Sequence, residues 1–239
     1  MSLNPQTPYP RNNNIQSLRG FAALLVVLSH LLIIEQKYSP DHILGQWAEF
    51  GMVGVDLFFV ISGFIMVYVT RVNMPPRPRT SLKFLFARFT RIYPLYWVIS
   101  AALLAVYVWR PELVFSSQPE PPHILKSFLL WPDTLPPLLA VGWTLIHELG
   151  FYLVFAFFLL FRARALPYFL LIWLMVLAGS QTIFADNVHQ PVTALILNPL
   201  SFEFIAGAFA ALIYLKTGAK FAPHILILGI IVATIILIT

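Results

Sequence analysis

The chain has 239 residues, 59% of them hydrophobic and only 10% charged, whereas about 25% of residues are charged in a soluble domain. It contains no cysteine, which excludes disulfides, a thiol nucleophile and cysteine metal sites. The formal net charge is +5, but the basic residues lie in short loops between apolar runs and no nucleic-acid motif is present, so the charge indicates membrane topology.

The apolar runs predict an all-α, polytopic transmembrane helical bundle with about seven spans, because each run approaches the length of a membrane-crossing helix. Residues 1–14 are polar and rich in proline and asparagine, and we expect them to be disordered, while residues 15–239 form one membrane domain. The predicted spans cover residues 16–34, 50–70, 92–109, 137–161, 167–184, 192–215 and 222–239.

The distribution of lysine and arginine predicts the orientation of this bundle. If the N-terminus is cytoplasmic, twelve of the fifteen basic residues face the cytoplasm, and the outer loops keep only Lys37, Arg110 and Lys126. This bias matches the positive-inside rule, so we expect a cytoplasmic N-terminus. Every acidic residue falls in an outer loop or inside a span, which makes the cytoplasmic face attractive to anions.

The first span carries two polar residues, Arg19 and His30, eleven residues apart. On a helix this spacing corresponds to about 16 Å, roughly half of the ~30 Å hydrocarbon core. Arg19 is therefore expected at the cytoplasmic surface and His30 well inside the bilayer. A polar side chain at that depth requires a partner or a function.

The second span places Asp56 in the outer half, where it is expected to meet His30. A carboxylate beside a histidine fixes its tautomer and raises its basicity, as a general base requires. The alternative is a structural pair that closes a helix hairpin. We expect Ser62 to make a hydrogen bond between helices or to contact substrate, rather than to act as a nucleophile. The glycines at 51, 54 and 63 are interpreted as positions where helices pack closely.

The segment 81–91 alternates bulky apolar and basic residues and predicts an interfacial amphipathic helix that leads into the third span. Arg88 and Arg91 share one face of this helix. Two guanidinium groups so placed can bind a polyphosphate bidentately, although lipid headgroup binding would use the same residues. The proline-rich outer loop 110–137 is expected to be a stiff connector or an acceptor-facing rim.

The fourth and sixth spans add three polar residues, Trp143, Glu148 and Glu203, and both carboxyl groups are expected in the outer half of the membrane. They extend the cluster of His30 and Asp56. A proton path would use the same kinds of residue, so this cluster indicates a functional site without identifying its reaction.

Four motifs in order resemble the acyltransferase type 3 family of integral membrane O-acyltransferases. They are R-x10-H at Arg19 and His30, G-x-x-G-V-D-x-F-F-x-x-S-G-F at 51–64, R-x-x-R-x-x-P at 88–94, and W-x-L-x-x-E-x-x-F-Y at 143–152. The sequence F-E-F-x-x-G at 202–207 also looks familial. Thr144 stands where the family usually has serine, and relatives have further spans after those seen here, so an incomplete acyltransferase domain is expected.

The resemblance implies transfer of an acyl group, most often acetyl, from cytoplasmic acyl-CoA to a hydroxyl of a carbohydrate or similar acceptor. Arg19, Arg88 and Arg91 would bind the phosphates of the donor. His30, assisted by Asp56 and Glu148, would be catalytic, by general base catalysis or through a transient acyl-histidine. Supporting or substrate-binding roles would fall to Ser62, Trp143 and Glu203. No metal is expected, and the bacterial cytoplasmic membrane is the expected location.

Two other classes of function remain open from the residues. A proton-coupled transporter or exporter subunit would relay protons through the same buried histidine and carboxyl groups, although the sequence lacks glycine- or proline-broken helices in two corresponding halves. A nonenzymatic membrane partner is the third possibility. Binding of acyl-CoA separates an acyltransferase from a proton-coupled transporter, which has no reason to bind it.

Overall fold

The computed structural model describes residues 13–39, 51–73, 78–114, 120–183 and 190–218. All regular structure in these ranges is helical, which confirms the all-α prediction. The elements are α1 (Asn13–Tyr38), α2 (Val53–Asn73), α3 (Pro78–Trp109), α4 (Pro111–Val114), α5 (Ile124–Leu129), α6 (Gly142–Phe158), the 3-10 helix η2 (Ala163–Ala165), α7 (Leu166–Ile183), α8 (Pro191–Ile196) and α9 (Leu200–Thr217).

Within the described ranges, five helical stretches are long and apolar enough to cross a membrane, so the chain is a multi-pass membrane protein. They are Asn13–Tyr38, Val53–Thr70, Arg79–Trp109, Ala163–Gln181 and Pro191–Thr217. A sixth apolar helix, α6, has only 17 residues. The predicted span 222–239 and the N-terminal segment 1–12 lie outside the described residues, and the total of seven spans and the cytoplasmic N-terminus stay predictions.

Proline changes two of the predicted spans. The span predicted at 137–161 becomes a helix only at Gly142, because prolines at 132, 136 and 137 remove amide donors and push the preceding residues away from helical geometry. The span predicted at 192–215 is interrupted between α8 and α9, where Pro199 follows a turn and the Asn198 side chain accepts a hydrogen bond from the Leu200 amide at 3.0 Å. Glu203 consequently lies in the first turn of α9.

The third predicted span and the segment before it form one continuous helix. α3 runs for 32 residues, about 48 Å at 1.5 Å per residue, with Pro94 inside it. The helix predicted at 81–91 is the first part of α3 and leads into the third span without a break, because Pro94 does not end the helix, and its interfacial position stays a prediction. Membrane helices tolerate an internal proline where neighbouring groups satisfy the freed backbone. The same rod thus carries Arg88, Arg91 and the residues beyond the proline.

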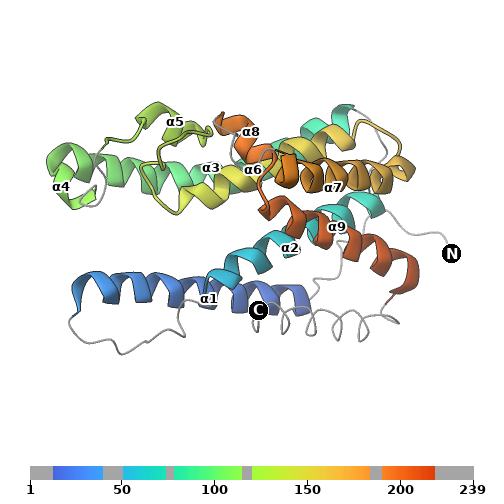
Figure 1. Cartoon of the computed structure of the whole chain (residues 1–239), viewed down its shortest axis with the longest axis horizontal. Helices are drawn as coiled ribbons and strands as arrows, with labels where there is room; N and C mark the ends of the chain where they lie inside the picture. Colours follow the sequence, from blue (N-terminus) through green and yellow to red (C-terminus); the bar gives the residue numbers. More distant parts are fainter. Residues whose placement is uncertain (1–12, 40–50, 74–77, 115–119, 184–189, 219–239) are drawn as a thin grey trace.

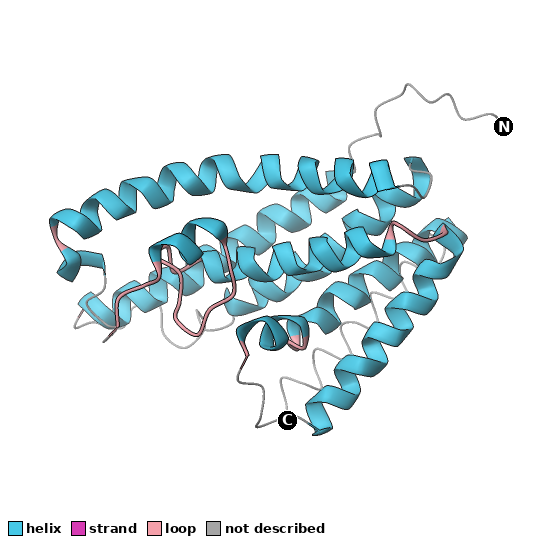
Figure 2. Cartoon of the chain, turned by 90° about the horizontal axis from the view of Figure 1, so that it is seen from above, coloured by secondary structure: helices cyan, strands magenta, loops and turns pink. Residues whose placement is uncertain are grey.

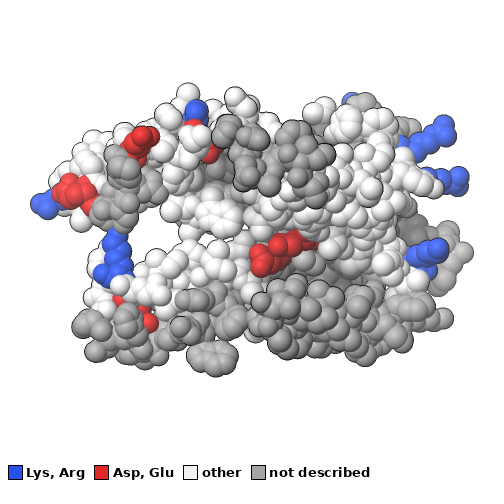
Figure 3. All heavy atoms as spheres, viewed as in Figure 1, with Lys and Arg blue, Asp and Glu red and all other residues white. Residues whose placement is uncertain are grey.

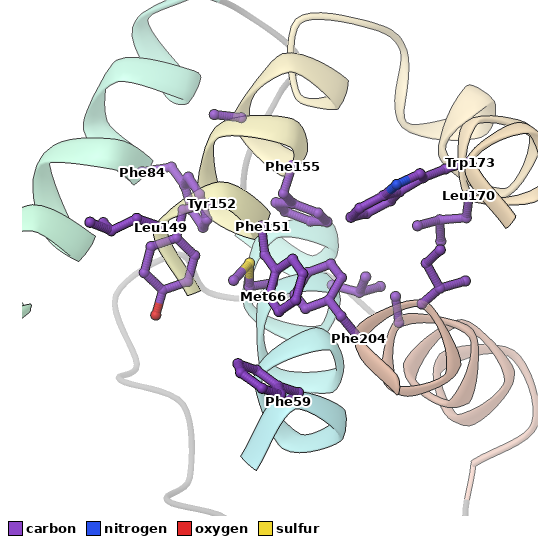
Figure 4. Packing of buried hydrophobic residues seen from close by; sticks show 14 of the residues in the cluster. Phe59, Met66, Phe84, Leu149, Phe151, Tyr152, Phe155, Leu170, Trp173 and Phe204 are labelled. Carbon is purple, nitrogen blue, oxygen red and sulfur yellow. The ribbon is translucent and has the colours of Figure 1, made fainter. Parts of the chain in front are cut away.

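The helices form two layers, which Figure 1 shows from the side and Figure 2 from above. One layer contains α1, α2 and α9, and the other contains α3, α6 and α7 with the short helices α4, α5 and α8. Aromatic side chains join the layers (Figure 4): the Phe151 ring stacks on Phe204 at 4.8 Å and meets the edge of Phe59 at 5.2 Å. Phe204 and Phe155 are fully buried in this core.

Glycines set the closest contacts between helices. A Cβ atom at Gly207 would lie 1.9 Å from the Val60 carbonyl oxygen, and one at Gly63 would lie 2.0 Å from the Phe204 carbonyl oxygen. α2 and α9 therefore cross backbone to backbone, and this is the most extensive helix contact among the described elements. Gly51 and Gly54 contact the α1 backbone in the same way. The packing interpretation of the glycines at 51, 54 and 63 is confirmed.

Candidate active site

A cavity of about 590 Å³ lies between α1, α2, α3 and α6, within the range of about 300–1,000 Å³ that is usual for small-molecule pockets. Figure 3 shows a hollow in the left part of the molecule, between α1 and the C-terminal part of α3. Most of the lining is apolar. Its polar and aromatic-polar members are Arg19, His30, Ser62, Arg88, Arg91, Tyr96, Trp143, Thr144, Glu148 and Tyr152. Seven of the nine predicted site residues thus share one cavity, and Asp56 and Glu203 do not line it.

Three arginines from two helices define what we call the arginine end of the cavity: Arg19, Arg88 and Arg91. Arg19 interacts electrostatically with the other two. The Arg88 guanidinium also lies over the rings of Phe84 and Tyr152, at 5.3 and 5.5 Å. The arginine end can therefore bind a polyanion.

Glu148 is the carboxyl group of the arginine end. Tyr152, one turn further along α6, donates a hydrogen bond to Glu148 Oε1, and Ser62 Oγ from α2 donates to the same oxygen at 3.4 Å. Glu148 also interacts electrostatically with Arg19. This carboxyl group holds α6 and α2 together and partly balances the arginines.

The opposite part of the cavity, toward which α1 and α3 both run, is what we call the histidine end; we assign to it the lining residues His30 of α1, Tyr96 of α3, and Leu139 and Val141 just before α6. His30 Nδ1 lies 2.7 Å from the Val26 carbonyl oxygen. Because a carbonyl only accepts, Nδ1 carries the proton, and in the neutral ring Nε2 keeps its lone pair. The helix itself thus sets the tautomer that a general base needs.

The two ends are separated along the helices. Gly51 contacts Ser29, so the start of α2 is level with His30, and α2 then runs antiparallel to α1 toward Arg19. Ser62 is eleven residues further on, about 16 Å along the axis. Glu148, which contacts Ser62, therefore lies near the arginines, whereas the sequence had suggested the depth of His30.

Asp56 and Glu203 form a second polar group on the other side of α2. Their carboxyl groups hydrogen-bond each other across the α2–α9 contact, one turn before the Val60–Gly207 crossing. Glu203 Oε2 is buried and has no partner among the described residues. Within the described residues, His30 makes no hydrogen bond to Asp56, so the predicted role of Asp56 toward His30 stays a prediction.

Sequence reasoning missed two tyrosines that line the cavity. Tyr152 was visible as part of a motif, and its spacing of four residues from Glu148 places both on one face of α6. Tyr96 gave no signal, because its partner, the Ser127 carbonyl, lies 31 residues away in the chain.

Comparison with known proteins identifies the family. The profile described as "Acyltransferase domain", of the acyltransferase type 3 family, matches residues 12–239. The chain belongs to the acyltransferase type 3 family. Its sequence is 35% identical over 182 residues to the exopolysaccharide production protein ExoZ of Rhizobium meliloti (strain 1021), a match that covers 72% of this chain and 54% of ExoZ.

Two further relatives extend this comparison. Acyltransferase MdmB of Streptomyces mycarofaciens is 27% identical over 248 residues, covering 92% of this chain and 62% of MdmB. Peptidoglycan O-acetyltransferase OatA of Listeria monocytogenes is 29% identical over 142 residues, covering 58% of this chain and 19% of OatA. The chain thus spans about half the length of the curated relatives that it matches first. No solved structure matches the chain.

Proposed function

We propose that the chain is a membrane O-acyltransferase that moves an acyl group, most often acetyl, from cytoplasmic acyl-CoA to a hydroxyl of a carbohydrate acceptor. The observation that carries this proposal is one cavity that joins three arginines to a histidine about 16 Å away. Family membership and the similarity to the exopolysaccharide production protein ExoZ and the peptidoglycan O-acetyltransferase OatA support acyl transfer and a saccharide acceptor.

The arginine end is suited to the phosphates of the donor. Arg19, Arg88 and Arg91 converge there, and guanidinium groups bind phosphate bidentately. Beyond them the cavity walls are apolar, with Ile92, Leu95 and other aliphatic side chains, and can accept a long, weakly polar acyl-pantetheine arm. We place the arginine end toward the cytoplasm and, because ExoZ and OatA are bacterial proteins, the chain in the bacterial cytoplasmic membrane.

At the histidine end His30 acts on the acceptor. Nε2 takes the proton of the acceptor hydroxyl while the hydroxyl oxygen forms a bond to the carbonyl carbon of the thioester. The C–S bond then breaks and the proton passes from Nε2 to the CoA sulfur, so no proton is gained or lost overall. Trp143 offers an aromatic face for the acceptor, and Glu148, with Ser62 and Tyr152, orients the arginines.

Replacing His30 with alanine tests the base. Transfer from radiolabelled acetyl-CoA should be lost in membranes without another acyltransferase, while acetyl-CoA binding stays at the wild-type level. The matched control is His147→Ala, because His147 Nδ1 also bonds a carbonyl one turn back, that of Trp143 at 2.8 Å, but does not line the cavity. Transfer by the His30 variant at the control rate would refute the proposal.

Replacing both Arg88 and Arg91 with alanine tests the donor site. Binding of acetyl-CoA to the purified protein should weaken by at least about tenfold, since a charge-assisted hydrogen bond contributes about 1.5–3 kcal/mol. Arg164→Ala is the control, because Arg164 is exposed and does not line the cavity. Absence of acetyl-CoA binding to the wild-type chain would contradict the donor assignment and favour a proton-coupled transporter.

A further inference from the structure

The short helix α5 ends in a strained turn that α3 holds in place. Leu130 follows its last residue with φ 52° and ψ 39°, a left-handed conformation that costs a non-glycine residue about 1–2 kcal/mol. The last carbonyl groups of a helix have no partner within it. Three side chains of α3 donate to them: Tyr96 to Ser127 O at 2.7 Å, Tyr93 to Leu129 O at 2.8 Å and Trp97 to Phe128 O at 2.9 Å.

The segment after α5 folds back onto the same helix. Ser127 Oγ donates to the His123 carbonyl and accepts a hydrogen bond from the Leu138 amide, both at 2.9 Å. The Asp133 carboxylate accepts hydrogen bonds from Lys126 Nζ at 3.0 Å and from His123 Nδ1. α5 and residues 130–141 thus form one tied unit, which we call the roof.

The roof closes the histidine end of the cavity. Leu139 and Val141 line the cavity, and a Cβ at Gly142 would lie 3.3 Å from the Tyr96 hydroxyl. α3 runs in the same direction as α1, so Tyr96, five residues beyond Arg91, lies toward the same end as His30. This wall therefore lies toward the end of the cavity that contains the proposed base.

Tyr96 differs from the other two donors. It is 3% exposed and lines the cavity, whereas Tyr93 is half-buried, Trp97 is exposed, and neither lines the cavity. Its carbonyl partner belongs to Ser127, whose hydroxyl holds the residue before Leu139. Two hydrogen bonds, both made by Ser127, thus connect α3 to Leu138, the neighbour of Leu139 in the cavity wall.

We propose that Tyr96 is a positioning residue that fixes the roof over the histidine end and thereby determines which hydroxyl compounds, water included, reach His30. This inference rests on the proposed acyl transfer and assigns a role to a residue that does not touch the reacting atoms. Without the Tyr96 hydroxyl, Ser127 and the roof lose a restraint, and water competes with the acceptor for the acyl group.

A unique thiol on the roof tests the positioning. The chain has no cysteine, so Val141→Cys supplies a single site for a maleimide in intact membranes. Adding Tyr96→Phe should raise the labelling rate about fivefold, the factor expected for one net hydrogen bond. Tyr93→Phe is the matched control, because it removes a bond to Leu129 at the end of α5 but leaves the bonds of Ser127 to Tyr96 and Leu138 intact, and it should leave the labelling rate at position 141 unchanged. Equal rates in the two variants would overturn the proposal.

Hydrolysis of acetyl-CoA by the purified protein without acceptor tests the function of the roof. Tyr96→Phe should raise hydrolysis about fivefold at an unchanged Kd for acetyl-CoA, and Tyr93→Phe should not. If Tyr96→Phe speeds labelling but leaves hydrolysis unchanged, the proposal that the roof keeps water from the acyl group is refuted. Because labelling requires no acyl chemistry, a chain that fails to bind acetyl-CoA would refute the proposed function and leave the labelling result to decide the position of the roof.

Discussion

Replacing Gly207 with alanine tests the close crossing of α2 and α9. The new Cβ would lie 1.9 Å from the Val60 carbonyl oxygen, whereas an ordinary contact requires at least 3.4 Å. The backbones must therefore move apart by about 1.5 Å along this direction, and a gap of about 0.5–1 Å already removes a quarter to a half of a contact's attraction. Phe204 and Ala208, which are fully buried beside the crossing, lose contacts.

The expected loss is about 1–3 kcal/mol or more, as for other overpacked cores. Thermal unfolding in detergent, followed by tryptophan fluorescence, measures it as a lower midpoint. Gly179→Ala on α7 is the matched control, because a Cβ there meets nothing within 4 Å and alanine favours the helix by about 1 kcal/mol. If the Gly207 variant were as stable as the Gly179 variant, the helices would not cross as closely as described.

Two further predictions concern carboxyl groups. Glu203→Gln should keep the hydrogen bond to Asp56 and leave the midpoint of thermal unfolding unchanged. Glu203→Ala should lower the free energy of unfolding by about 1–3 kcal/mol, because Asp56 loses this partner. Equal midpoints for the two variants would contradict the pairing. Burial raises the pKa of Asp133, but hydrogen bonds from Lys126, His123 and the Thr134 amide outweigh it, so the pKa lies below the usual 3.8. The stabilisation of the folded state by Asp133 is therefore present above pH 3.8 and is lost as the pH falls through the lower pKa of the folded state. At neutral pH, Asp133→Asn should speed the maleimide labelling of Val141→Cys, because the roof loses these hydrogen bonds. An unchanged labelling rate would contradict a restraint by Asp133.

The helical fold and most of the cavity followed from local patterns. Apolar runs gave the helices, and polar residues inside them gave Arg19, His30 and Glu148, because a polar side chain in a span stands out against its neighbours. The predicted depth of polar residues along a span was less accurate. Glu148 lies at the arginine end because hydrogen bonds from Ser62 of α2 and from Tyr152 hold its carboxyl group there, and that depends on packing between helices.

Contacts between distant segments could not be predicted. Asp56 faces α9 because Gly63 and Gly207 bring α2 and α9 together, and only the three-dimensional crossing shows which of two neighbouring faces of α2 lines the cavity. The hydrogen bond between Tyr96 and Ser127 likewise joins α3 and α5, and nothing in either sequence indicates that the two helices are in contact. Periodicity identifies a buried face, but not the helix that covers it.

The continuity of α3 through Pro94 links the two ends of the site mechanically. Arg88 and Tyr96 are eight residues apart on one rod, about 12 Å, so a tilt of about 5° around the arginine end displaces Tyr96 by about 1 Å. A ligand that tilted α3 at Arg88 would therefore also shift the roof, and by reciprocity a ligand that displaced the roof would change the affinity at the arginines. Under the proposed function, we therefore expect donor and acceptor to affect each other's binding.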